Sequence, residues 1–382
     1  MTITSHAPDQ TRVTLVDRAA AVGEVIAQHA DRHDRDGTFV EESVELLRDA
    51  RLLAMAVPVE LGGEGASIAD VAAVQRELAH HCGSTALATA MHQHVVAFTA
   101  WRHRRGLPGA EATLRRVAEE GIVLVSTGGA DQTHPRGEAT AVDGGYRVSG
   151  RKVFCSQSPA GTAMSTMFAF DDPEQGRRVL NMAIPLAADG VTVLDDWDVL
   201  GMRGTGSSTI VLDDVFVPED KVLANRPHGT VDGPLQVILS IAFPIICGAY
   251  LGVAEAAHRA AVQATGPRRD DPIVQRQVGL MADRLRVAGW ALDGALASVG
   301  DDPQPSMETV ADVMAAKREI ALAGLEVCDV AMDVAGGAAF YRGSVIERCY
   351  RDMRAVKFHP FTLEQTLVHA GRLALGLPTD QV

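Results

Sequence analysis

The spacing of apolar residues divides the chain into helical and strand-like zones. Up to about residue 122, apolar positions recur every three or four residues, which gathers them on one face of a helix. The pattern is clearest in segments 15–26, 40–54, 68–78 and 87–101. Segment 58–65 interrupts it with one proline and three glycines, so we expect a loop there.

From about residue 123 to 222, the chain consists of short runs rich in β-branched and apolar residues. These runs begin at Val123, Ala139, Tyr146, Ser165, Leu180, Val191 and Thr209. Turn residues separate them, as at 143–145 and 189–190, and short runs punctuated by turns are typical of strands. We predict a small β domain, either a barrel or a sandwich.

Helical spacing resumes near residue 230 and continues to Gly376, with breaks at 266–272 and 335–343. This order of zones predicts an α+β protein of three domains. We assign residues 1–122 to an N-terminal helical domain, 123–228 to the β domain and 229–382 to a C-terminal helical bundle.

Segment 237–254 is an uncharged stretch of 18 residues, close to the length at which a helix can span a membrane. It is single and internal, and it contains Pro244, Gly248 and Gly252. A helix buried on all sides in a bundle is equally apolar. We therefore predict a core helix and no membrane association.

Charge and composition favour a soluble cytoplasmic enzyme. The 382 residues include 35 Lys plus Arg and 49 Asp plus Glu, for a net charge of −14, whereas nucleic-acid binders need basic surfaces. The five cysteines form no CxxC pair, so we expect neither a disulfide framework nor a zinc–thiolate site. The histidines at 80–81 and 92–94 do not share a helix face, so no metal site is predicted. Residues 1–24 lack the apolar stretch of a signal peptide.

The common motifs of nucleotide-binding proteins and hydrolases do not occur in the sequence. There is no GxGxxG or GxxxxGK(S/T), so neither a dinucleotide fold nor a P-loop is indicated. There is also no GxSxG or HExxH. These motifs alone leave the activity unassigned.

Four segments carry a resemblance to a known family. They are PVELGGEGASIADVAAVQRELA (58–79), GGYRVSGRKVFCSQS (144–158), LGMRGTGSSTIVLDDVFVPEDKVL (200–223) and AGGAAFYRGSVIERCYRDMRA (335–355). In this order they resemble the acyl-CoA dehydrogenase superfamily of flavoproteins over nearly the whole chain. The resemblance implies a helical N-terminal domain, a middle β-barrel and a C-terminal four-helix bundle. It further implies a flavin, normally FAD, between the β domain and the C-terminal helices. A homo-oligomer, usually a tetramer or dimer, would complete the flavin site with a neighbouring subunit.

The resemblance also implies which residues of the β domain contact the flavin. Ser126 and Thr127, at a predicted strand end, would offer hydroxyl and N–H groups to its polar edge. Ser156, on a predicted strand at 153–156, stands where the family has a Thr or Ser that contacts flavin N5. Phe154 stands where dehydrogenases commonly have a Trp that packs on the isoalloxazine ring.

Two pairs of residues in the C-terminal region would bind the rest of the cofactor. Arg268 and Arg269 occupy the loop from which the family reaches the partner subunit's FAD phosphate, although the Phe-Gly that follows in the family is missing here. Gly336 and Gly337 would allow a close backbone approach to the cofactor. Asp333 stands where many members have Gln.

The carboxylate base of the dehydrogenases is missing from its usual positions. Counted from the RD pair at 351–352, the usual Glu falls at Pro360, and the alternative Glu of some members falls near Ala242. Neither residue accepts a proton, and general-base catalysis supplies about 10²–10⁴-fold in rate. Glu364, one helical turn beyond Pro360, is a weak substitute.

Other residues resemble the oxygenase branch of the superfamily, which includes the dibenzothiophene monooxygenases. His359 precedes the missing Glu, FCSQ (154–157) resembles an F-x-S-G hairpin, and His92 follows a Gly-Ser helix start at 83–84. We therefore predict catalytic roles for His359, Ser156 and His92, since an imidazole that titrates near neutrality can supply or orient a proton.

Three functions stay open. The first is an oxygenase that acts on a small organic or thioester substrate and uses reduced flavin, FAD or reduced FMN, from a separate reductase, because no NAD(P)H motif is present. The second is an acyl-CoA dehydrogenase that passes electrons to an electron-transferring flavoprotein. The third is a flavoprotein subunit without catalysis.

Overall fold

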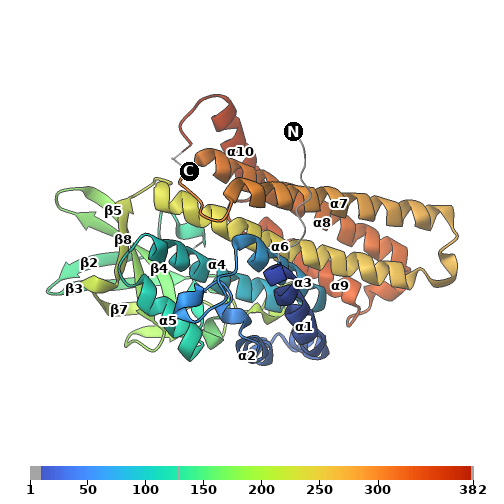
Figure 1. Ribbon diagram of the computed structural model, residues 1–382, viewed down its shortest axis with the longest axis horizontal. Coiled ribbons are helices and arrows are strands. Elements are labelled where there is room, and N and C mark those ends of the chain that lie inside the picture. The colour runs from blue at the N-terminus through green and yellow to red at the C-terminus, as the bar shows by residue number, and fades with distance from the viewer. Residues whose placement is uncertain (1–9, 128, 380–382) are drawn as a thin grey trace.

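The computed structural model describes residues 10–127 and 129–379 (Figure 1). The first region is helical and consists of α1 (Gln10–Asp36), α2 (Glu41–Asp49), α3 (Ile68–His81), α4 (Gly83–Arg104) and α5 (Ala110–Glu120). The predicted loop at 58–65 contains only a short 3₁₀ turn, Val59–Leu61. Ser67 then caps α3, because its hydroxyl accepts a hydrogen bond from the Asp70 N–H at 3.1 Å while the Asp70 carboxylate accepts one from the Ser67 N–H.

Eight strands of the middle region form one sheet. They are β1 (Leu124–Ser126), β2 (Glu138–Val142), β3 (Gly145–Lys152), β4 (Ala163–Asp172), β5 (Gly176–Pro185), β6 (Val191–Val193), β7 (Ile210–Pro218) and β8 (Val222–Pro227). The order is β6-β7-β3-β2-β4-β5-β8, and β1 pairs with β4 beside this path. Within the described strands no pairing joins β6 to β8, which are the two ends of this path.

The third region is again helical. It contains α6 (Gly233–Ala264), α7 (Pro272–Val299), α8 (Met307–Ala335), α9 (Val345–Met353) and α10 (Leu363–Ala374). The expected α+β fold, with helices on either side of a central sheet region in the sequence, is confirmed. Our domain limits at 122/123 and 228/229 stay a prediction, although they fall between the elements.

Helix α6 is the apolar stretch of the sequence, and it lies at the centre of the helices rather than at the surface (Figure 1). It passes α3 closely because Gly248 and Gly252 have no side chain. A Cβ on Gly248 would lie 2.4 Å from the Ala72 carbonyl oxygen, and one on Gly252 would lie 2.2 Å from that of Arg76. Its length and apolar composition would suit a membrane span, but 94% of its most apolar 18 residues are buried inside the protein. It is a core helix.

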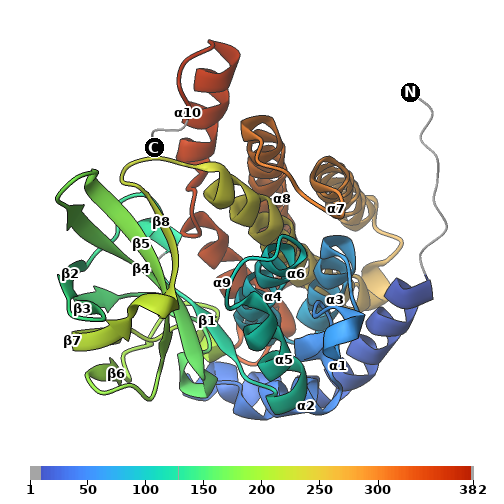
Figure 2. The same ribbon diagram turned by 60° about the vertical axis from the view of Figure 1, so that its left-hand side comes forward.

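The sheet and the helices have separate apolar cores, and β1 runs along the seam between them (Figure 2). Strand β1 pairs in parallel with β4 and packs on α4. The residues at the end of β1 therefore face both the sheet and the helices.

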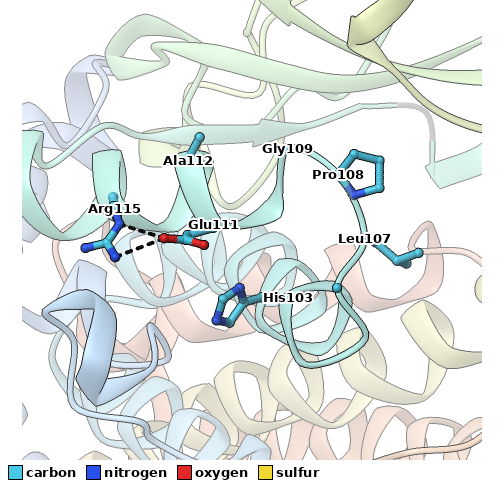
Figure 3. A pocket seen from close by; sticks show the side chains of 8 residues that line it. His103, Leu107, Pro108, Gly109, Glu111, Ala112 and Arg115 are labelled. Atoms are coloured by element: carbon cyan, nitrogen blue, oxygen red, sulfur yellow. Dashed lines mark hydrogen bonds and ion pairs between the residues drawn. The ribbon is translucent and has the colours of Figure 1, made fainter.

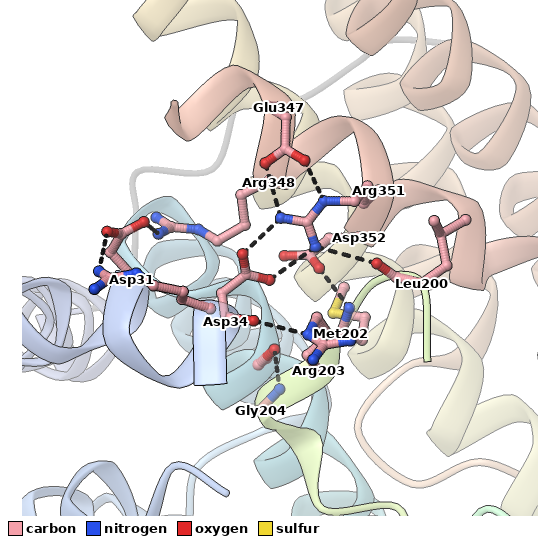
Figure 4. A network of polar contacts seen from close by, with 12 residues as sticks. Asp31, Asp34, Leu200, Met202, Arg203, Gly204, Glu347, Arg348, Arg351 and Asp352 are labelled. Atoms are coloured by element: carbon pink, nitrogen blue, oxygen red, sulfur yellow. Dashed lines mark hydrogen bonds and ion pairs between the residues drawn. The ribbon is translucent and has the colours of Figure 1, made fainter. Parts of the chain in front are cut away.

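A buried polar network holds the three regions together (Figure 4). The Arg351 guanidinium of α9 donates to Asp34 at the end of α1, at 2.5 and 2.9 Å, and to Glu347 one turn earlier at 2.5 and 2.8 Å. The neighbouring Asp352 carboxylate accepts the Met202 N–H from the loop between β6 and β7. The RD pair thus ties the C-terminal helices to both other regions.

A second charged contact joins α3 to α6. The Glu255 carboxylate accepts hydrogen bonds from Arg76 Nε at 2.9 Å and from His80 Nε2 at 2.7 Å. Burial raises the pKa of Glu255, but the hydrogen bonds and charges of Arg76 and His80 outweigh burial and hold this pKa at about 2. The carboxylate therefore stabilises the folded state only while it is ionised.

This pKa predicts a pH dependence of stability. Because the pKa is lower in the folded than in the unfolded chain, the contribution of Glu255 is full above the unfolded value and is lost as pH falls toward 2. We expect Glu255→Gln to lower the free energy of unfolding by up to about 3 kcal/mol at pH 7. The difference from wild type should shrink steadily below pH 5 in urea unfolding curves. A difference that stays constant from pH 7 to 3 would contradict this assignment.

Candidate functional site

His94 of α4 meets Ser126 at the end of β1. His94 Nε2 lies 3.1 Å from Ser126 Oγ, and His94 Nδ1 lies 3.1 Å from the Ala90 carbonyl oxygen. Because a carbonyl only accepts, Nδ1 carries the proton and Nε2 accepts the Ser126 hydroxyl hydrogen. Burial lowers the pKa of His94 to about 4, so the ring is neutral at pH 7. Ser126 therefore keeps its lone pairs for a further donor.

Two other predicted residues are bound to the backbone. The Thr127 hydroxyl and N–H both donate to the Ser165 carbonyl, at 3.3 and 3.2 Å. The buried His92 donates from Nε2 to the Leu53 carbonyl at 2.9 Å and accepts the Leu124 N–H at Nδ1 at 3.0 Å. Burial lowers the pKa of His92 to about 4. Since both its ring nitrogens are engaged, the geometry favours His94 over His92 for contact with a ligand.

His359 lies across the seam from Ser126, in the turn between α9 and α10. Its Nδ1 is 2.7 Å from the hydroxyl of Tyr250, which is buried in the middle of α6. The next residue, Pro360, packs on the segment that follows β1, where a Cβ added to Gly129 would lie 2.9 Å from Pro360 Cγ. The fold thus brings together side chains from α4, β1, α6 and the turn after α9.

Two adjacent cations of α8 hold this turn. Lys317 Nζ donates to the carbonyls of His359 at 3.0 Å and Phe361 at 2.5 Å, and Arg318 donates to that of Leu363 at 3.0 Å. Lys317 is only 1% exposed, and burial lowers its pKa to about 8. No carboxylate forms an ion pair with Lys317 within residues 10–127 and 129–379. Among the described residues its ammonium group faces these two carbonyl dipoles and the Phe243 ring, whose centroid lies 5.9 Å from Nζ.

These neighbours fix the protonation state of His359. Burial, and after it the positive charge of Lys317, lowers the pKa of His359 to about 4. Burial also raises the pKa of Tyr250 well above its ordinary value, so the phenol keeps its hydrogen and can donate it to Nδ1. The imidazole is therefore neutral at pH 7, and when the phenol donates to Nδ1 its single proton lies on Nε2.

Neither position of the dehydrogenase base carries a carboxylate. Ala242 is buried in α6, and Pro360 packs on Gly129. Glu364, the weak substitute, is exposed in the first turn of α10. The groups at the seam are thus imidazole, phenol and hydroxyl groups.

The end of the β3 hairpin differs from the sequence expectation. The predicted strand at 153–156 is wrong, because β3 ends at Lys152, where its pairing with β7 stops, and left-handed backbone at Phe154 (φ 57°) and Gln157 (φ 55°) turns the chain. The turn leaves the Phe154 ring 63% exposed, edge-on to Trp197 at 5.8 Å between ring centroids. Ser156 is buried, and its hydroxyl lies 2.8 Å from that of Ser207.

The remaining predicted cofactor residues lie at the other end of the helices. Arg268 donates to the Val334 carbonyl at 2.5 Å, which joins the α6–α7 turn to the end of α8, and the exposed Arg269 follows it. Gly336 and Gly337 begin the 3₁₀ turn that follows α8. From Tyr250 to the end of α6 is about 21 Å along the helix axis. Within one chain the α6–α7 turn and the end of α8 therefore lie at the end of the long helices that is remote from the sheet (Figure 1).

Two surface hollows lie elsewhere. One of about 520 Å³ is lined by the α4–α5 turn, where Glu111 pairs with Arg115 beside His103 (Figure 3). Another of about 480 Å³ lies between α3 and α6 at His80 and Glu255. Neither contains a residue that the sequence predicts as catalytic or cofactor-binding, so neither defines the candidate site.

Comparison with known proteins identifies the family. The acyl-CoA dehydrogenase N-terminal domain matches residues 13–127, and the acyl-CoA dehydrogenase C-terminal domain matches residues 244–364. Putative acyl-CoA dehydrogenase YdbM of Bacillus subtilis is 31% identical over 94% of this chain and 96% of its own length. The chain belongs to the acyl-CoA dehydrogenase superfamily.

Other relatives are named as a nitrososynthase and as an FMNH2-dependent monooxygenase. L-evernosamine nitrososynthase of a Micromonospora species is 30% identical over 96% of this chain and 91% of its own. The probable FMNH2-dependent monooxygenase SfnC of Pseudomonas putida is 28% identical over 93% of both chains. The structure of KijD3 with FMN and a dTDP-amino-keto-sugar has a TM-score of 0.87 and 29% identity, over 98% of this chain and 96% of that one. As a member of this superfamily the chain is a flavin-dependent oxidoreductase, and its relatives favour an oxygenase over the other two functions.

The residues at the seam fit a flavin. Ser126 keeps free lone pairs, and the exposed Phe154 offers an apolar edge beside Trp197. The buried Gln157 donates to the Leu124 carbonyl, but its Oε1 has no partner among the described residues. An isoalloxazine ring has both an apolar face and polar edges. It would supply hydrogen-bond donors to Ser126 and Gln157 and apolar contact to Phe154.

The sequence missed three residues of this site, His94, Tyr250 and Lys317. The sequence nevertheless contains a feature that could have pointed to each of them. His94 is two residues from His92 and so lies on another helix face. Tyr250 is the only phenol within the apolar stretch 237–254, and Lys317 is the only lysine of α8.

Proposed function

We propose that the protein is a flavin-dependent monooxygenase that uses reduced FMN and O₂ to oxygenate a small organic substrate. His359 and Ser156 would be its catalytic residues, assisted by Tyr250. Because the sequence lacks an NAD(P)H motif, a separate reductase would supply the reduced flavin. Reduced flavin would supply the electrons for O₂ activation, and the chain's own residues would bind it, exclude water and hold one proton at His359 Nε2.

The observation that carries this proposal is the neutral His359–Tyr250 pair at the seam, with no carboxylate at either family base position. α-Proton abstraction from an acyl thioester needs a strong base, which a neutral imidazole of low pKa is not. A neutral Nε2–H can instead donate a hydrogen bond to a reacting oxygen. Dehydrogenation would have to use the exposed Glu364.

A second copy of the chain would complete the cofactor site. Arg268, Arg269, Gly336 and Gly337 are too far from Ser126 to bind the same flavin within one chain. The helical end that carries them also exposes Phe340 and Tyr341, and Trp290 is exposed on α7. Exposed aromatic side chains of this kind favour association. We infer a homo-oligomer, a tetramer in keeping with the family, located in the cytoplasm.

The test is flavin binding followed by reaction with O₂. We expect FMN to co-elute with the protein in gel filtration, with light scattering that gives a multiple of the 40.5 kDa chain mass. With a flavin reductase, the loaded protein should then consume O₂ and oxygenate an added organic substrate. If an acyl-CoA instead bleaches the bound flavin without O₂ and without reductase, the protein is a dehydrogenase. If neither FMN nor FAD binds, the proposal fails.

A further inference from the structure

The hydroxyl groups of Ser156, Ser207 and Thr205 form a hydrogen-bonded chain that ends on a backbone carbonyl. Ser156 Oγ is 2.8 Å from Ser207 Oγ, and Ser207 Oγ is 2.7 Å from Thr205 Oγ1. Thr205 Oγ1 is 2.9 Å from the Met202 carbonyl oxygen. All three hydroxyl-bearing side chains are buried.

The carbonyl at the end sets the direction of every hydrogen in this chain. A carbonyl oxygen has no hydrogen to give, so the contact with Met202 must use the single hydroxyl hydrogen of Thr205. Ser207 must then donate to Thr205, and Ser156 must donate to Ser207. The opposite order would leave two oxygens in contact without a hydrogen between them, which is unfavourable in a buried site.

This order leaves Ser156 with no hydrogen for a ligand. Its hydroxyl hydrogen points toward Ser207, and only its lone pairs remain for a group on its other side. Ser156 is therefore an acceptor and not a donor, and Ser207 and Thr205 determine this from a distance.

The two redox states of a flavin differ in what they offer at N5. Reduced flavin carries a hydrogen there and donates, whereas oxidised flavin presents a lone pair and accepts. A hydrogen-bond acceptor opposite N5 therefore binds the N–H of reduced flavin and repels the lone pair of oxidised flavin.

We propose that the Thr205–Ser207–Ser156 chain makes the protein select reduced over oxidised flavin. This inference rests on the proposed function and on the position of Ser156, which stands where the family has a Thr or Ser that contacts flavin N5. Thr205 and Ser207 act as positioning residues, and neither needs to touch the cofactor. The selection suits a protein that receives flavin already reduced, because the oxidised product then leaves more readily.

The test compares the dissociation constants of FMN and of dithionite-reduced FMN, the latter without O₂. We expect wild-type protein to bind reduced FMN about tenfold more tightly, the worth of one hydrogen bond gained against one lone-pair clash. Equivalently, the midpoint potential of bound FMN should lie about 30 mV above that of free FMN.

Thr205→Val is the decisive variant. It removes the acceptor of Ser207, whose hydrogen can then turn to Ser156, so that Ser156 can donate to oxidised FMN. The Met202 carbonyl stays satisfied, because it also accepts from the Thr205 N–H at 3.1 Å and from Trp197 Nε1 at 3.2 Å. We expect the ratio of the dissociation constants of oxidised and reduced FMN to fall from about ten to one or below in this variant.

A second disrupting variant and a matched control complete the test. Ser207→Ala frees the Ser156 hydrogen by another route and should also abolish the preference, even if Thr205→Val folds poorly. Ser158→Ala is the matched control, since it removes a buried hydroxyl that donates to the Gly206 carbonyl at 3.1 Å, and that carbonyl still accepts the Ser158 N–H. It should keep the wild-type preference.

The outcomes separate this inference from the function. If FMN binds and the ratio of the two dissociation constants is near unity in wild type, or is unchanged in Thr205→Val and Ser207→Ala, the inference is wrong while the oxygenase proposal stands. If neither form of FMN binds, the proposed function fails and the inference with it.

Discussion

Replacing His359 with alanine is expected to lower oxygenation by 10²-fold or more while FMN binding is retained, in line with the loss of a positioned proton donor. The reason is the proposed role of His359, in which the Tyr250 hydroxyl donates to Nδ1 and Nε2–H is the donor to the reacting oxygen. The measurement is product formed per reduced FMN consumed, with hydrogen peroxide release recorded in parallel. Uncoupling to peroxide should rise as product falls.

The controls for this prediction use the same kind of change elsewhere. His134→Ala removes an exposed imidazole, which lies edge-on to His228 and 3.0 Å from the Thr133 hydroxyl, and should leave product yield unchanged. Tyr250→Phe removes the donor to Nδ1 and should lower yield less than His359→Ala, because the imidazole remains. Equal yields in His359→Ala and wild type would remove His359 from the mechanism.

The pH profile gives a second check on the same residue. Since the pKa of His359 is about 4, the imidazole stays neutral from pH 5 to 8, and its titration should leave no inflection in that range. An inflection near pH 6.5 that disappears in His359→Ala would contradict the protonation state derived from its burial and from Lys317.

Arg351→Met is expected to destabilise the fold by about 3–5 kcal/mol, because it leaves buried carboxylates without their cation. Asp34 and Glu347 share this guanidinium, and the side chains of all three residues are no more than 14% exposed. The same guanidinium donates to the Leu200 carbonyl at 3.1 Å, so the loss affects all three regions. The measurement is the free energy of unfolding from urea titration followed by circular dichroism.

An exposed pair provides the matched comparison. Arg115 bonds Glu111 one turn away on α5, with side chains 45% and 56% exposed. Arg115→Met should therefore cost less than about 1 kcal/mol. If both methionine variants unfold at the same urea concentration as wild type, the network in Figure 4 contributes nothing measurable to stability.

The sequence by itself determined the order of the three regions and the character of α6, since both follow from periodicity over neighbouring residues. It also determined that Pro360 and Ala242 stand where the resemblance implies the dehydrogenase base, because that requires only the alignment of the chain with the family's motifs. The resemblance of four segments to the superfamily predicted that the protein binds a flavin. Strand β8 escaped prediction because VLANRP has neither strict alternation nor a turn to mark it, and because only pairing with β5 keeps it extended.

Only the tertiary structure decided how the site is assembled. His94 and not His92 meets Ser126 because residues two apart on a helix point to different faces, and only the packing of β1 on α4 selects one. Tyr250 and His359 are 109 residues apart, and Ser156 and Ser207 are 51 apart. No local pattern encodes such pairs, because their contacts form only when separate elements pack together. The direction of the hydroxyl chain at Ser156 likewise depends on where Met202 places one carbonyl oxygen.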